Sequence, residues 1–332
     1  MKLAWEIARH YLAPRRGGRF LSFITWISLG GVTVGVTALV VVIAVMTGAQ
    51  EDFQEKILEA NPHILLLEYS GALRMGDWHS LVDSVKGVEG VVTASPFLLT
   101  KVALERETFS QAADLYGLSV EGMGEAATGI EERIRDGVLS LGETESGFPP
   151  LLVGSRLADR MLLFPGDTLF VIALENIRRD PFGGYYPAIR QFEISGTFST
   201  GLYDYDMENL YARMEDVQDL AGVLESDQIS GLGVRVDDPW NAADIGDSID
   251  AILGYPYYAQ SWDLTNQELF SALRLEKLVM GLILFLIVVV AAFNIVSTLV
   301  MVVVERTREI GILKSMGMED KRILHVFILQ GL

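Results

Sequence analysis

Two long uncharged segments constrain the fold of this chain more than any other feature. Leu21–Gln50 and Leu278–Val304 hold 30 and 27 residues without one Asp, Glu, Lys or Arg. A bilayer is spanned by about 20 apolar residues, so each segment predicts a transmembrane helix. This excludes a purely soluble protein. The segment 51–277 reads as ordinary globular sequence, which excludes a channel made wholly of membrane helices. A cleaved signal peptide, whose apolar part has about 7–15 residues, is too short to explain the first segment.

The charge distribution predicts how the chain is oriented in the membrane. Residues 1–20 carry five basic groups and one acidic group, and residues 305–325 carry five basic and four acidic groups. The segment 51–277 carries 16 basic and 39 acidic residues. Short basic flanks stay in the cytoplasm, whereas long domains cross largely regardless of charge. We therefore expect both flanks inside and the acidic domain outside, where it would repel nucleic acid.

These patterns predict six consecutive regions and a multi-pass topology. We expect the chain to be truncated at the start of a third span, because the ten mostly apolar residues Ile323–Leu332 that follow Arg322 are too few to cross a bilayer. A short interfacial helix is the alternative interpretation of this end. The expected regions are a cytoplasmic amphipathic N-terminal helix (1–20), transmembrane helix 1 (21–50), the outer domain (51–277), transmembrane helix 2 (278–304), a cytoplasmic segment (305–322) and the start of transmembrane helix 3 (323–332).

The outer domain is predicted to be α+β and to be entered and left through long helices. Helical spacing continues from the first span to Ala60, where Asn61-Pro62 stops it. Residues 266–277 read as a helix that leads into the second span. Two β-α-β patterns are predicted, one with strands 63–68 and 96–104 around a helix 78–85, the other with strands 231–236 and 257–262 around a helix 242–253. They form a core, or porter, at about 61–105 and 230–263, with a strand-rich inserted subdomain at about 106–229. The two long helices could transmit movement, or they could simply be long spans.

An unusual segment, 176–190, lies between two predicted strands. Its prolines and glycines predict an irregular loop longer than a plain hairpin needs. The aromatic residues Phe182, Tyr185 and Tyr186 are typical of binding loops. We favour binding, and the alternative is that they pack back on their own sheet.

The sequence lacks the motifs of the common catalytic sites. It has no phosphate-binding loop, no nucleophile elbow, no cysteine and only four scattered histidines. Neither predicted span holds an ionisable residue, so nothing indicates a proton or ion relay. We expect a non-catalytic chain without a cofactor or metal of its own, whose transport energy would come from another chain.

The segment after the second span predicts a short helix with an apolar stripe. Ile310, Leu313 and Met316 recur at helical spacing, and Gly317 is a typical residue after a helix end. Such a helix favours docking in a groove of a partner. A solvated turn is the alternative.

At this segment the sequence resembles a known family. Residues 305–317, E-R-T-R-E-I-G-I-L-K-S-M-G, are similar to the coupling segment of type VII ABC transporter permeases, the MacB, FtsX and LolC/LolE group. Three further segments resemble the lipoprotein-releasing LolC/LolE branch: Ala4–Leu12 with Phe23–Ser28, Phe293–Met301, and Gly196–Phe198 with Gly201–Asp206. The whole layout agrees with that group, except that the family has four spans.

The resemblance implies a membrane protein with a large periplasmic MacB-like α+β porter, located in the bacterial inner membrane. It implies an ATP-driven complex that extracts lipoproteins by mechanotransmission. The implied partners are a LolD-type ATPase dimer that binds ATP and Mg, a second LolC/LolE-type permease, a LolA-type periplasmic carrier, lipoprotein substrates and membrane lipid.

The resemblance also assigns residues to three functions. The ATPase-coupling residues would be Glu305, Arg306, Glu309, Ile310, Gly311, Ile312, Leu313, Lys314, Met316 and Gly317. The carrier-binding hook and the adjacent polar patch would be Asp180, Pro181, Phe182, Gly183, Gly184, Tyr185, Tyr186, Pro187, Arg190 and Gln191. Residues that could line a lipid-tail site are Val40, Ile43, Met46, Leu278, Gly281 and Leu282.

Three other functions remain open at this point. An FtsX-like signal transmitter would control cell-wall hydrolases, and a MacB-like efflux permease would need an outer-membrane duct. A membrane-anchored enzyme is disfavoured by the missing site chemistry. The sequence does not distinguish a LolC-type from a LolE-type chain, or either from a single homodimeric permease.

Overall fold

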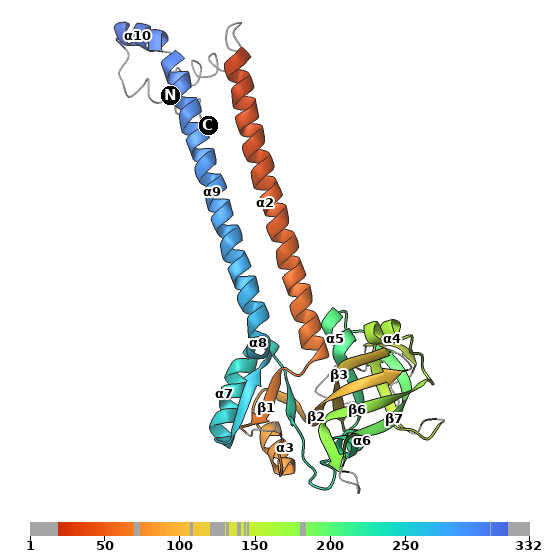
Figure 1. Cartoon of the computed structure of the whole chain (residues 1–332). Helices are drawn as coiled ribbons and strands as arrows, with labels where there is room; N and C mark the ends of the chain where they lie inside the picture. Colours follow the sequence, from red (N-terminus) through yellow and green to blue (C-terminus); the bar gives the residue numbers. More distant parts are fainter. Residues whose placement is uncertain are drawn as a thin grey trace. The chain divides into compact units, whose positions relative to one another are not determined.

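The chain forms two units that are connected through two long helices (Figure 1). The membrane unit comprises residues 1–49 and 271–332, and the outer unit comprises residues 50–270. The computed structural model describes residues 19–69, 74–106, 109–119, 130, 133–137, 141–142, 144, 146–179, 184–305 and 307–317. Most of the predicted N-terminal amphipathic helix and the whole predicted start of a third span lie outside this part.

The two long helices are α2 (Arg19–Ala60) and α9 (Gln267–Glu305). Both are long and apolar enough to cross a membrane, over residues 30–60 and 267–298. The expected continuous helix after the first span is confirmed, because α2 ends at Ala60. Pro62 explains this end, since it lacks an N–H and disfavours helical geometry in the residue before it. A short helix, α10 (Thr307–Ser315), follows α9, and Gly317 takes a φ of +86° after it.

The porter lobe interleaves the two predicted β-α-β patterns. It consists of β1 (Ile64–Glu68), α3 (Trp78–Lys86), the first half of β2 (Val91–Arg106), β9 (Gly231–Val236), η3 (Pro239–Asn241), α7 (Ala242–Leu253), β10 (Tyr257–Ser261) and α8 (Trp262–Thr265). The strand order is β10-β1-β9-β2, and β1 pairs antiparallel with both neighbours. β9 also pairs antiparallel with β2. Each β-α-β pattern therefore encloses a strand of the other, which is a split β-α-β arrangement.

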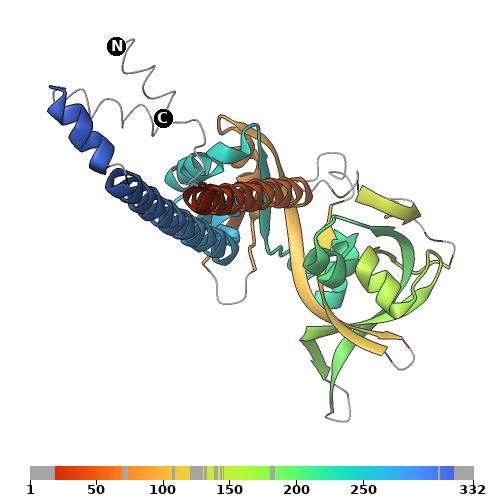
Figure 2. The same ribbon diagram turned by 90° about the horizontal axis from the view of Figure 1, so that it is seen from above.

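The inserted lobe begins with the second half of β2. It consists of β3 (Phe109–Leu118), β4 (Ile134–Gly137), β5 (Pro150–Gly154), α4 (Ser155–Met161), β6 (Thr168–Arg179), β7 (Tyr185–Phe198), α5 (Tyr203–Glu208), β8 (Asn209–Arg213) and α6 (Met214–Ala221). β2 pairs with β9 over residues 91–97 and with β3 over residues 97–106. Figure 2 shows β2, in orange, running from one lobe into the other. The lobes therefore share one strand, with Phe97 at the change of partner.

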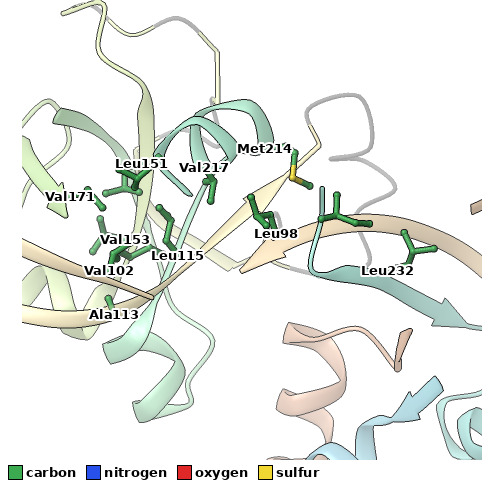
Figure 3. Packing of buried hydrophobic residues seen from close by; sticks show 14 of the residues in the cluster. Leu98, Val102, Ala113, Leu115, Leu151, Val153, Val171, Met214, Val217 and Leu232 are labelled. Carbon is green, nitrogen blue, oxygen red and sulfur yellow. The ribbon is translucent and has the colours of Figure 1, made fainter. Parts of the chain in front are cut away.

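A continuous apolar core lies on one face of the sheet in both lobes. In the porter lobe, Ile64 and Leu66 of β1 pack with Val85 of α3 and Ile249 of α7. In the inserted lobe the same core includes Leu115, Val153 and Val217, and Figure 3 shows these side chains converging around β2. A smaller core on the opposite face contains Leu118, Leu152, Phe198 and Tyr211. The second face is thus covered only in part.

The prediction of an irregular loop at 176–190 is wrong, because most of this segment is strand. β6 continues to Arg179 and β7 begins at Tyr185, with Arg179 opposite Tyr185 and Ile177 opposite Pro187. The ladder shifts register between Ile172 and Ile177. A proline is tolerated in a strand at an edge or beside such an irregularity. The segment is therefore a long hairpin instead of an extended irregular loop.

Candidate functional site

The outer unit contains a cavity of about 430 Å³ between the two lobes. Its floor is the open face of the porter sheet, with Leu65 and Leu67 of β1 and Gly233 of β9. Residues alternate between the two faces of a strand, so Ile64 and Leu66 face the core while Leu65 and Leu67 face the cavity.

An aromatic row extends from the cavity floor into the inserted lobe. Phe97 of β2 lies 6.5 Å from Tyr116 of β3, and Tyr116 stacks on Tyr211 of β8 at 5.5 Å between ring centroids. Tyr211 in turn makes an edge contact with Phe198 of β7 at 5.1 Å. Because β3 and β8 pair in parallel with Tyr116 opposite Tyr211, the fold itself fixes this row. The first three rings line the cavity.

Hydroxyl and amide groups gather at the same end of the cavity. The Asn61 side chain hydrogen-bonds Tyr205, and the Asn209 side chain hydrogen-bonds Tyr211. Burial raises the pKa of Tyr116, and the neighbouring Asp114 charge adds to this shift. Burial likewise raises the pKa of Tyr211. Both phenols therefore stay neutral at physiological pH and can act as hydrogen-bond donors.

A charged group closes the sheet edge between the lobes. The guanidinium of Arg74 donates to the Leu99 carbonyl at 3.2 Å, to Ser230 Oγ at 3.1 Å and to Glu175 Oε2 at 3.0 Å. Ser230 Oγ also accepts the Leu99 N–H at 2.9 Å. Arg74 and Ser230 thus satisfy backbone groups of β2 in the gap between its ladders with β9 and β6. Lys101, Asp204 and Glu208 add further charges to the cavity lining.

The end of α2 is held by the inserted lobe. Ile57 is 1% exposed in the main core, and the Asn61 N–H donates to the Ile57 carbonyl. Glu59 forms an ion pair with Arg133. A Cβ on Gly201 would lie 3.3 Å from the Lys56 side chain, so helix and loop are in contact there. These contacts fix the last turns of α2 beside the cavity.

The start of α9 is held by the porter lobe. The backbone N–H of Trp262 donates to the His63 carbonyl at 2.9 Å, and its indole donates to the Pro239 carbonyl at 2.8 Å. The Trp262 ring also makes edge contacts with Trp240 and Phe270. The two long helices therefore attach to different lobes, and Asn61 and Trp262 bring both attachments to the cavity.

The β6–β7 hairpin carries the predicted hook. Asp180, Pro181, Phe182 and Gly183 lie outside the described residues. Gly184 precedes β7, and Tyr185 and Tyr186 are 74% and 47% exposed on its first residues, followed by Pro187. Phe170, Leu174, Ile177 and Ile189 are also at least half exposed. The hairpin thus presents a row of apolar and aromatic side chains to solvent.

The two predicted patch residues point to opposite faces of β7. Arg190 donates to Asp216 Oδ1 at 2.8 Å and to Asp219 Oδ2 at 2.9 Å, both on α6. Gln191 instead donates to Thr168 Oγ1 at 3.0 Å on the face of the exposed Phe170. The structure does not bring these two residues together. Arg190 holds the hairpin against α6, while Gln191 belongs to the solvent face.

The remaining predicted residues lie in the membrane unit. Gly311, Ile312 and Lys314 are exposed on α10 and Ile310 is half-buried, while the exposed Met316 and Gly317 follow the helix. Arg306 lies outside the described residues, and the side chains of Glu305, Glu309 and Leu313 lie outside them as well. Val40, Leu278, Gly281 and Leu282 are exposed, and Ile43 and Met46 are half-buried. In the described part of the chain, no cluster of His, Asp and Glu could hold a metal ion.

The cavity is the feature that our sequence interpretation missed. Two signals pointed to it. β1 reads I-L-L-L-E, which is apolar on both faces and is typical of a strand with both faces covered. β9 contains Gly231 and Gly233, and glycine within a strand often marks a close approach of another group. A Cβ on Gly231 would lie 2.8 Å from the Leu67 side chain.

Comparison with known proteins places this architecture in a family. The MacB-like periplasmic core domain family matches residues 25–252, and the FtsX-like permease C-terminal family matches residues 281–332. The lipoprotein-releasing system transmembrane protein LolC of Xylella fastidiosa strain 9a5c is 30% identical over 99% of this chain and 77% of its own length. The chain belongs to the LolC/LolE family. The resemblance noted in the sequence is thereby confirmed.

Other members of the LolC/LolE family match over the same extent. The LolC protein of Neisseria meningitidis serogroup B is 29% identical over 99% of this chain and 77% of its own length. The LolE protein of Haemophilus influenzae is 24% identical over 100% of this chain and 78% of its own length. The periplasmic region of MacB from Actinobacillus actinomycetemcomitans superposes with a TM-score of 0.37 at 15% identity, over 64% of this chain and 94% of that one.

Proposed function

We propose that this chain is a permease subunit of an ATP-driven complex that releases lipoproteins from the inner membrane and passes them to a periplasmic carrier. The observation that carries the proposal is near full-length similarity to proteins named lipoprotein-releasing system transmembrane proteins. A MacB-like core domain flanked by two apolar helices supports it. In this proposal the flanks 1–20 and 305–322 are cytoplasmic and the segment 51–277 is periplasmic.

The proposed energy source is a separate ATPase that docks on α10. Ile310 and Ile312 of this short helix and Met316 directly after it are apolar, and Ile312 and Met316 are 52% and 79% exposed. An exposed apolar helix surface favours a groove on another protein. The chain itself supplies no ATP or Mg site in this proposal, and it acts with a second LolC/LolE-type permease.

The proposed carrier site is the hairpin. Exposed Tyr185 and Tyr186 offer rigid aromatic groups, which are enriched among the residues that dominate binding energy. We expect Tyr185→Ala to weaken capture of a LolA-type carrier by about tenfold or more, because a residue of this kind contributes at least ~1.4 kcal/mol. Tyr203→Ala is the matched control, since Tyr203 is 63% exposed on α5, outside the hairpin.

Depletion of the chain in cells tests the proposed function as a whole. Mature lipoproteins should accumulate in the inner membrane, and normal sorting after depletion would overturn the proposal. Co-purification with a cell-wall hydrolase activator, or with an outer-membrane duct in place of a carrier, would favour the FtsX-like or the MacB-like alternative.

The coupling site has its own test in the assembled complex. Ile310→Asp should abolish co-purification of the ATPase, because a carboxylate would be buried without a partner in an apolar groove. Ser315→Asp adds the same charge on the same exposed helix and should leave recovery unchanged. Equal recovery with both variants would contradict the assignment of α10.

A further inference from the structure

We infer that the interlobe cavity of the outer unit binds a single aliphatic chain next to a carbonyl group, as found in an acyl ester or acyl amide. This inference deepens the proposed function and relies on it only for the source of the ligand. The residues predicted from the sequence to line a lipid-tail site all belong to the membrane unit, and none of them lines this cavity.

The shape and lining of the cavity favour an apolar ligand. Its volume of about 430 Å³ falls within the range of roughly 300–1,000 Å³ that is typical of ligand sites. Leu65, Leu67, Phe97 and Leu99 form an apolar surface along β1 and β2. Leu65 and Leu67 remain only half-buried although they lie in a central strand of the sheet. Covering such a surface with another apolar group lowers the free energy, because apolar area is removed from water.

The chemistry at one end of the cavity favours a neutral polar group in the ligand. The Tyr116 and Tyr211 phenols have raised pKa values because they are buried. Neutral phenols and side-chain amides hydrogen-bond a carbonyl oxygen without requiring a charge on it. Asn61 and Asn209 hold the neighbouring hydroxyls of Tyr205 and Tyr211 in place. An ester or amide carbonyl matches this end, and an aliphatic chain matches the rest.

The position of the cavity along the chain explains where such a ligand would come from. Asn61 directly follows α2, and Asn266 directly precedes α9. Only residues 51–60 separate the uncharged run of α2 from the cavity lining, and residues 267–277 do so for α9. Both helices that carry the apolar spans therefore end at the cavity. A chain that leaves the lipid phase along either helix would reach this surface.

Photochemical labelling of the full chain in phosphatidylethanolamine and phosphatidylglycerol nanodiscs tests the inference. Three probes carry the same diazirine: a diacylglyceryl lipopeptide with the group in one acyl chain, a phospholipid with it in one acyl chain, and the unacylated peptide. We expect the acylated probes to label β1 and β2 at Leu67 and Leu99, and the unacylated peptide to leave both unlabelled. Labelling confined to residues 30–49 and 271–305 would overturn the inference, as would equal labelling by the unacylated peptide.

A matched pair of substitutions makes the result specific to the cavity. Leu67→Trp should reduce labelling of Leu99 at least about fivefold, because the added ring occupies the space that the chain needs. Leu174→Trp makes the same change at a site that is 51% exposed on the hairpin and should have no effect. If Leu67→Trp does not fold, the label map of the unsubstituted chain still decides the question.

The two acylated probes separate this inference from the proposed function. Labelling of the cavity by the phospholipid alone would support the aliphatic-chain site and argue against lipoprotein as cargo. Labelling of the spans alone by the lipopeptide would support the cargo and overturn the cavity site. A cavity that stays unlabelled because a second copy of the chain covers it would also overturn the site.

Discussion

Ile57→Ala tests whether the end of α2 is firmly seated in the outer unit. The Ile57 side chain is 1% exposed in the main core, whereas Phe53, one turn earlier on the same helix, is 41% exposed. Truncation of a buried isoleucine costs about 2–5 kcal/mol, because transfer energy is lost and a cavity remains. Alanine recovers about 0.4 kcal/mol through its higher helix propensity. We therefore expect a net loss of about 2–4 kcal/mol.

This loss is large enough to measure by thermal unfolding of the full chain in detergent micelles. For a unit the size of residues 50–270, each kcal/mol lowers the Tm by roughly 2–4 °C. Ile57→Ala should therefore lower the transition of the outer unit by about 4–16 °C. The near-ultraviolet circular dichroism of this unit reports the change, because Trp78, Trp240 and Trp262 lie within it.

Phe53→Ala is the control, and local hydrogen exchange gives an independent readout. Phe53→Ala should cost no more than about 1 kcal/mol, because the ring is already partly in solvent. It should therefore lower the Tm by no more than roughly 2–4 °C. The Asn61 amide, which donates to the Ile57 carbonyl, should exchange faster only in Ile57→Ala. Equal Tm values for the two variants, or unchanged exchange at Asn61, would refute the reasoning that Ile57 holds the helix end.

Three further predictions concern the outer unit. His63 has a lowered pKa because of burial and the nearby Arg235. The His63 side chain therefore takes up a proton more readily in the unfolded chain than in the folded one, so the free energy of unfolding should fall as the pH drops below about 6.5. Measured over a pH series, this fall should be less steep for His63→Gln than for the unsubstituted chain. Gly154→Ala would place a Cβ 2.2 Å from the Asp206 carbonyl oxygen and should lower stability by about 1–3 kcal/mol or more in thermal unfolding. Gly246→Ala, within α7 and in ordinary contact only, should be neutral or stabilising. Asp216→Ala removes the carboxylate that Arg190 and Arg213 share. It should cost about 1.5–3 kcal/mol in chemical denaturation, because charged hydrogen bonds are lost while both guanidinium groups stay partly exposed to water.

Local signals in the sequence were sufficient for the two long helices and for the elements of the two β-α-β patterns, but not for α5 or for the interleaving of the strands. Asn61-Pro62 marked the end of α2 correctly, and α7 was predicted with its observed bounds, Ala242–Leu253. These elements end at residues with strong local preferences, or they repeat at a clear helical spacing. Such signals do not depend on which other strand lies alongside.

The elements that sequence reasoning missed depend on distant partners. β2 begins at Val91, five residues before the predicted strand, because its first half pairs with β9, more than 130 residues later in the chain. β8 was not predicted, since its five residues are stabilised between β3 and β5. The β6–β7 hairpin is longer than expected because its two strands support each other beyond the bulge. Pairing of this kind is invisible to a local pattern.

The candidate site escaped prediction for the same reason, because its lining comes from both lobes. α2 ends in the inserted lobe through Ile57 and Glu59, and α9 begins in the porter lobe through Trp262. Two connections join the lobes along the chain, β2 near Phe97 and the segment that leads from α6 into β9. Both border the cavity, since Phe97 and Ser230 line it.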